Sequence, residues 1–193
     1  MAMFLILAPF GAFSLLMLVA STSVSLFAGA AVSLGIIGYD LIRGGSIKIL
    51  AAGSVVVFGA IGGYVTLLHG QLSPAGARIA VDGGVLAIAL LSLAIRVPFS
   101  LQYARENVDP EIMKLPGFLR ANYIITWAWT AAFLLMLVAN LLMIYVPGLP
   151  LWLGLAIAFA ARNSAMYFTR WYPRYRRNNA PPLDRRGSHG DLR

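Results

Sequence analysis

The sequence predicts an all-α, polytopic membrane helical bundle with six transmembrane helices and both termini in the cytoplasm. The first observation is composition, since 60% of the 193 residues are hydrophobic and only 11% are charged. In an ordinary soluble domain roughly 45–50% of the residues are hydrophobic and about 25% are charged. The second observation is that the charges are clustered and separated by long apolar runs. This much apolar surface, with a mean hydropathy of +0.79, requires a bilayer around most of the chain.

The first two helices are expected in the amino-terminal run 1–39, which carries no charged side chain. As one helix this run would be about 58 Å long, nearly twice the ~30 Å hydrocarbon thickness. We therefore expect it to fold back at its polar cluster, Ser21-Thr22-Ser23, and predict spans at 3–20 and 24–42. The run has no basic n-region, so a retained helix is expected rather than a cleaved signal peptide.

The third and fourth spans are predicted at 47–68 and 83–101. The third ends before the segment 69–76, whose Gly, Ser and Pro residues favour a loop. The fourth is short and carries Arg96 inside it.

The fifth and sixth spans come from a second charge-free run, 121–161. Its Pro147-Gly148-Leu149-Pro150 segment favours a turn over a continued helix, which predicts spans at 121–145 and 150–170.

These spans form one transmembrane domain, 1–172, with an interfacial loop at 98–120 and a basic, disordered cytoplasmic tail at 173–193. In the loop, Asp109-Pro110-Glu111 predicts the start of a short interfacial helix, because it combines an N-cap residue, proline at the first helical position and an acid in the first turn.

The distribution of Lys and Arg indicates the orientation, because positive residues are retained on the cytoplasmic side. Six crossings place fourteen of the 15 basic residues on one side and leave only Arg78 on the other. Both termini are therefore expected in the cytoplasm.

Ionisable groups at membrane depth are the first candidates for function, because each is costly there unless it is paired or hydrated. We expect an intramembrane polar cluster of Asp40, Arg96, Arg162 and Asn163 at the cytoplasmic ends of the second, fourth and sixth spans. Two alternatives stay open, namely that both arginines snorkel to lipid phosphates or that they bind a ligand or ion.

The fifth span carries an inward polar face made of Asn122, Thr126 and Asn140, with Trp129 on the same side. Interhelical hydrogen bonds of such residues fix helix orientation, so packing is favoured over a permeation path.

Small residues at helical spacing predict close helix packing in a membrane. Gly59 and Gly63 form such a pair in the third span, and Ala31, Gly35 and Gly38 form a ridge in the second.

Catalytic, metal and cofactor sites are not expected. The chain has no cysteine, which excludes thiolate chemistry. It has only two histidines, His69 and His189, at a span end and in the tail, and their positions exclude a two-histidine metal set and a Ser-His-Asp arrangement. We therefore expect no enzyme, no catalytic residue, no metal and no cofactor.

Anionic lipid headgroups on the cytoplasmic side are the expected partners, together with other membrane protein subunits. Basic residues in the loop and in the tail lie next to span ends, where they attract such lipids. Aromatic residues between the arginines of the tail can also stack nucleic acid, but a membrane end explains them more simply, so no nucleic acid is expected. The residues are Arg105, Lys114, Arg120, Arg170, Arg174, Arg176 and Arg177.

Several positions within roughly 35–165 carry a resemblance to a known family. They are Tyr39-Asp40-Leu41-Ile42-Arg43 with Lys48, Val55-Val56-Val57-Phe58-Gly59 with Leu67-Leu68-His69, Leu115-Pro116, the series Asn122, Trp129, Phe133, Ala139 and Asn140, and Pro147. Together they resemble the bacterial intracellular septation protein A family, and segment 98–105 is more like uncharacterised relatives of it. The resemblance implies a small multi-pass protein of the bacterial inner membrane, associated with cell-envelope and division processes and without established catalytic residues.

Two functions are therefore expected. The first is a non-enzymatic inner-membrane protein that supports cell-envelope and division processes or acts as a helical subunit of a larger membrane complex. The alternative is a small transporter or channel, which would prefer anions if Arg96 and Arg162 line a cavity.

Overall fold

The computed structural model describes residues 2–67, 72–106, 108–146 and 148–179. Within these residues the chain is all-α and contains no strand. Eight helices are seen there: α1 (Ala2–Leu16), α2 (Thr22–Ile42), α3 (Ile49–Leu67), α4 (Pro74–Ala94), α5 (Phe99–Arg105), α6 (Pro110–Met113), α7 (Pro116–Tyr145) and α8 (Leu151–Asn178).

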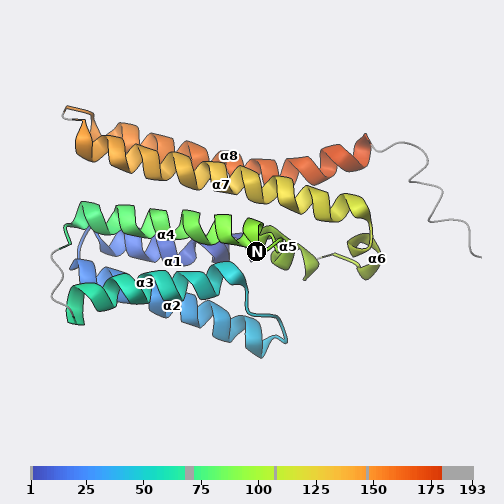
Figure 1. Cartoon of the computed structure of the whole chain (residues 1–193), viewed down its shortest axis with the longest axis horizontal. Helices are drawn as coiled ribbons and strands as arrows, with labels where there is room; N and C mark the ends of the chain where they lie inside the picture. Colours follow the sequence, from blue (N-terminus) through green and yellow to red (C-terminus); the bar gives the residue numbers. More distant parts are fainter. Residues whose placement is uncertain (1, 68–71, 107, 147, 180–193) are drawn as a thin grey trace, which may run out of the picture.

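The long helices form an antiparallel bundle (Figure 1). Along the chain, α1 packs on α2, α2 on α3, α3 on α4 and α4 on α7. The two longest helices, α7 and α8, pair with each other, and α7 packs along α4 (Figure 1). The short helices α5 and α6 connect α4 to α7 at one end of the bundle, which we call the α5/α6 end (Figure 1).

Among the described residues, four helices are long and apolar enough to cross a membrane: α2, α3, α4 and α7. The expectation of a helical bundle with apolar spans is confirmed to that extent. The described apolar part of α1, Leu7–Leu16, is shorter than a span. α8 is long enough, but Arg162 and the arginines from Arg170 onward lower its hydropathy.

The fold-back in the amino-terminal run lies at residues 17–21, so it begins four residues before the expected turn at 21–23. α1 ends at Leu16, and backbone hydrogen bonds continue the turn as far as Ala20. Ser21 then caps α2, because its Oγ accepts a hydrogen bond from the Val24 amide at 3.3 Å.

The helix expected over 83–101 instead runs from Pro74 to Ala94. Ser73 starts it nine residues earlier, because its Oγ accepts a hydrogen bond from the Gly76 amide at 3.1 Å and proline is favoured at the first helical position. Arg96 ends it with a positive φ of 59°. After Pro98 the chain starts the separate helix α5.

α8 also differs from the expected span 150–170, because it continues to Asn178. Residues 173–178, expected in a disordered tail, are therefore helical. Aromatic pairs four residues apart extend the helix, with ring centroids 5.2 Å apart for Phe168 and Tyr172 and 4.9 Å for Trp171 and Tyr175. The rest of the expected tail, 180–193, lies outside the described residues.

Two aromatic clusters form the core. Phe58 of α3 is fully buried, and the centroid of its ring lies 5.5 Å from the ring centroids of Phe10 and Phe13 of α1. Phe133 of α7 contacts Trp129 and, across the bundle, Phe99 of α5. The second cluster holds the first residue of α5 against the middle of α7.

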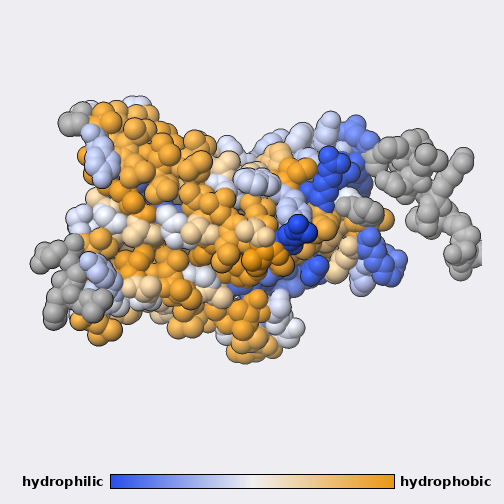
Figure 2. Space-filling view, in the orientation of Figure 1, coloured by the Kyte–Doolittle hydropathy of each residue, from blue (hydrophilic) through white to orange (hydrophobic). Residues whose placement is uncertain are grey.

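The molecular surface is divided by polarity along the bundle. Figure 2 shows apolar residues over much of the flanks of the long helices and hydrophilic residues gathered at the α5/α6 end. This is the arrangement expected when a belt of lipid surrounds the helices and water contacts their ends.

Candidate functional site

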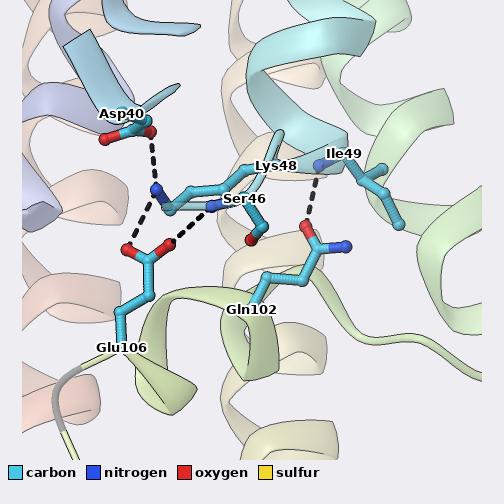
Figure 3. Close-up of polar contacts among 6 residues, drawn as sticks. All are labelled: Asp40, Ser46, Lys48, Ile49, Gln102 and Glu106. Carbon is cyan, nitrogen blue, oxygen red and sulfur yellow. Dashed lines mark hydrogen bonds and ion pairs between the residues drawn. The ribbon is translucent and has the colours of Figure 1, made fainter. Parts of the chain in front are cut away.

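The most elaborate polar site is centred on Lys48, in the loop between α2 and α3 (Figure 3). The Lys48 side chain is only 2% exposed, and its Nζ lies 2.5 Å from Asp40 Oδ2 and 3.0 Å from Glu106 Oε2. Asp40 belongs to the last turn of α2, and Glu106 follows α5. One amine thus joins two elements that are 66 residues apart in the chain. We call Asp40, Lys48, Gln102, Tyr103 and Glu106 the Lys48 cluster.

The loop turns sharply to bring Lys48 back to α2. Gly44 has φ +72°, a conformation that glycine adopts without steric cost. The Gly45 amide donates to the Asp40 carbonyl oxygen at 2.8 Å.

Two backbone amides of this loop donate to side chains of the α5 segment (Figure 3). The Ser46 amide donates to Glu106 Oε1 at 3.4 Å, and the Ile49 amide donates to Gln102 Oε1 at 2.7 Å. The second bond satisfies an amide in the first turn of α3 that has no partner within the helix. The Lys48 cluster therefore fastens α5 to the start of α3.

The electrostatics keep Lys48 charged. Burial lowers the pKa of Lys48, but the hydrogen bonds and charges of Asp40 and Glu106 outweigh burial and raise the pKa above its ordinary value. The ammonium also lies 5.2 Å from the centre of the Tyr103 ring, where a cation is attracted to the ring face. At neutral pH the amine is thus a structural cation rather than a nucleophile or base.

The predicted cluster of Asp40, Arg96, Arg162 and Asn163 is not assembled. Asp40 pairs with Lys48, and no ion pair joins it to either arginine among the residues that the structure describes. Arg96 is exposed at the end of α4. Asp40 meets Lys48 instead, because the tight loop after α2 turns back toward the end of that helix.

Arg162 and Asn163 do lie together, near the middle of α8. They line a pocket of about 290 Å³ with Leu7 and Ala8 of α1 and Met166 of α8. Arg162 is partly buried, and Asn163 Nδ2 donates to the Phe159 carbonyl oxygen at 2.7 Å. This pocket, which we call the Arg162 pocket, is the only part of the predicted cluster in which two members are adjacent.

The polar residues of α7 point into the bundle. Asn122 and Thr126 are buried, and both meet Ser100 of α5. Ser100 Oγ lies 2.9 Å from Thr126 Oγ1 and donates to the Asn122 carbonyl oxygen at 2.8 Å. These contacts fix the orientation of α5 on α7.

Asn140 contacts a residue that the sequence reasoning did not consider, Asp82 of α4. Its Nδ2 donates to Asp82 Oδ2 and so links α7 to α4. Arg78 lies one helical turn before Asp82. The sequence contains a signal for the early start of α4, which is Ser73-Pro74. A helix that starts there includes both Arg78 and Asp82.

All seven residues expected to contact anionic lipids are exposed. Arg176 Nη1 donates to the Gly117 carbonyl oxygen at 3.2 Å, which joins the end of α8 to the start of α7. Lys114 pairs with Glu111 at 2.9 Å on the surface. The others are Arg105, Arg120, Arg170, Arg174 and Arg177. Hydrophilic residues gather at the α5/α6 end (Figure 2).

Metal ligation finds no support in the described ranges, where no three His, Cys, Asp or Glu residues are grouped closely enough to hold an ion. His69 and His189 lie outside these ranges.

The fold and its polar sites define a class, an all-helical bundle with four helices that could span a membrane. Comparisons with protein-family models, with curated protein sequences and with solved structures found no match.

Proposed function

We propose that the chain is a non-enzymatic, multi-pass protein of the bacterial inner membrane that acts as a helical subunit of a larger membrane complex. The four apolar helices support the membrane location. The gathering of basic residues supports an orientation with the α5/α6 end in the cytoplasm. The resemblance to the septation protein A family adds the expected process, which is support of the cell envelope and division.

The observation that carries this proposal is the edge position of α8. This helix packs mainly along α7, and the large side chains on its outer face are exposed, including Trp152, Phe159 and Tyr167. A complex would cover that face with another subunit.

A groove between α7 and α8 supports the same proposal. It has a volume of about 460 Å³ and is lined mainly by small residues, among them Ala128, Ala132, Ala160, Ala161 and Ser164. Small residues allow helix backbones to approach closely in a membrane.

The test is extraction of the native protein in detergent-free lipid particles, followed by measurement of the protein mass per particle. We expect a mass well above the 20.8 kDa of one chain. Ser164→Phe should release the partner by filling the groove, whereas Val56→Phe, on an exposed position of α3, should leave the mass unchanged. Particles that contain single chains only would overturn the proposal, and so would turnover of a lipid by the purified protein.

A second candidate is a small anion transporter or channel, and the Arg162 pocket favours it. Arg96 does not line that pocket, so only one of the two arginines supports the idea. Anion flux into liposomes that is abolished by Arg162→Ala and kept by Arg96→Ala would favour transport over a subunit role.

A further inference from the structure

Arg162 lies at the level of the middle of the bundle. It follows Leu151, the first residue of α8, by eleven positions, which corresponds to about 16 Å along the helix. Its neighbour Ala161 lines the same groove as Ala132, and Ala132 is close to the centre of the apolar helix Gly117–Tyr145. If α7 crosses a hydrocarbon core of ~30 Å, Arg162 is near its midplane.

No acidic residue of the described chain neutralises this charge. The ion pairs found there involve Lys48 and Lys114. The carboxylate of Asp82, also in an apolar helix, is bound by Asn140. An arginine at the centre of a membrane helix costs about 2.5–3.5 kcal/mol on the insertion scale unless it is paired or hydrated.

Snorkelling does not direct this side chain to the basic end of the molecule. A helical side chain leans toward the amino terminus of its helix, and the amino terminus of α8 lies at the end opposite the α5/α6 end (Figure 1). The preferred rotamers of a helical arginine therefore direct the guanidinium toward the end opposite the α5/α6 end.

We infer that Arg162 is a docking residue for a partner membrane helix that carries one Asp or Glu near its centre. Headgroup phosphates lie more than about 15 Å from the midplane, so a helix-borne carboxylate is the anion that resides at this depth. The guanidinium accommodates a carboxylate through two parallel hydrogen bonds. The inference rests on the proposed subunit role, and it names the chemistry of the partner.

The lining of the Arg162 pocket suits the flank of such a helix. Apart from Arg162 and Asn163, its lining residues Leu7, Ala8 and Met166 are apolar, as the flanks of a membrane helix are. Asn163 is exposed beside Arg162 and supplies a second polar group next to the carboxylate.

The test uses a synthetic poly-leucine transmembrane peptide with one central Asp, and a matched peptide with Leu at that position. Association with the full chain is measured by energy transfer between fluorophores in phosphatidylcholine vesicles. We expect the Asp peptide to bind about tenfold more tightly than the Leu peptide, a difference of about 1.4 kcal/mol. Arg162→Leu should abolish the preference, Arg162→Lys should keep part of it, and Arg170→Leu, on the same helix, should leave it intact.

Equal binding of the two peptides, or a preference that survives in Arg162→Leu, would overturn the inference. It would also be overturned if phosphatidylglycerol in the vesicles removed the preference by occupying Arg162, because the site would then be a headgroup site. These failures differ from failure of the subunit role. That role fails if native particles contain single chains, whereas the inference alone fails if partners are present but the Asp peptide is not preferred.

Discussion

At Lys48 a single, almost fully buried ammonium group bridges two partly exposed carboxylates, those of Asp40 and Glu106. Lys48→Met keeps most of the apolar volume but leaves Asp40 and Glu106 facing each other without a cation. Removing one partner of a buried ion pair costs about 3–5 kcal/mol. Because Glu106 is 32% exposed, we expect a loss near the lower limit, about 3 kcal/mol, in the free energy of unfolding measured by SDS titration in mixed micelles.

Lys114→Met is the matched control for this prediction. Lys114 pairs with Glu111, but the two side chains are 73% and 83% exposed, and such surface pairs contribute less than about 1 kcal/mol. Equal losses in the two variants would show that the Lys48 cluster does not stabilise the bundle.

The same amine predicts a loss of stability at alkaline pH. The pKa of Lys48 is raised above 10.5 in the folded protein, so the folded state holds this proton more tightly than the unfolded state does. The stabilisation is complete below the unfolded pKa and is lost as pH rises through the folded pKa. Burial also raises the pKa of Tyr103, so ionisation of Tyr103 lowers the stability at alkaline pH as well. The contribution of Tyr103 must therefore be removed before that of Lys48 is measured.

We therefore compare Tyr103→Phe with Tyr103→Phe/Lys48→Met by following the unfolding midpoint from pH 8 to pH 12. The midpoint of the single variant should fall more steeply above pH 10.5 than that of the double variant. Parallel curves would show that Lys48 does not carry the effect.

Which polar groups meet was harder to predict than which groups lie inside. The spacing of Asn122, Thr126 and Asn140 placed them on one side of a helix, because helical periodicity depends on local sequence alone. The partner of Asp40 depends on the path of a six-residue loop with a glycine at positive φ. Asp82 was missed because the start of α4 was placed nine residues too late.

At the scale of elements, close helix contacts occur at glycines other than the expected ones. A Cβ added at Gly35, Gly38, Gly59 or Gly63 would have no atom within 4 Å outside its own local chain. The tight positions are instead Gly29 against Phe58, Gly53 against Ile88, Gly84 against Val57 and Gly154 against Met143. Small-residue spacing identifies a helix face that another helix could approach. It does not determine on which face the neighbouring helix actually packs.

Gly84→Ala should therefore destabilise the contact between α3 and α4. The added Cβ would lie 2.5 Å from Val57 Cγ1, and a β-branched side chain in a helix cannot easily rotate away. We expect a loss of about 1–3 kcal/mol from overpacking, measured by the same SDS titration. Gly83→Ala is the adjacent control, because its Cβ meets nothing within 4 Å; it should be neutral or slightly stabilising. A loss in Gly83→Ala as large as in Gly84→Ala would refute the packing explanation.

At the scale of the whole molecule, the all-helical class follows from additive properties of the sequence, which are apolar content and the length of charge-free runs. Whether α8 crosses a membrane does not follow from them, because Arg162 and the arginines from Arg170 onward lower the hydropathy of this helix. A helix of this kind is held by its contacts with α7, such as the hydrogen bond of 2.9 Å from Trp129 Nε1 to Thr169 Oγ1. Such contacts depend on the fold and not on a sum over residues.

The topology gives the last prediction, which tests whether α8 crosses the membrane. The chain has no cysteine, so single cysteines at Glu111, Pro150 and Asn179 report their side of the membrane through an impermeant maleimide. If α8 crosses, Glu111→Cys and Asn179→Cys react from the cytoplasmic face and Pro150→Cys from the opposite one. If α8 instead lies outside the membrane, Asn179→Cys must react on the same face as Pro150→Cys, because no crossing separates them. That second outcome would remove Arg162 from the membrane midplane, and the need for a partner carboxylate would disappear with it, since water would then solvate the guanidinium.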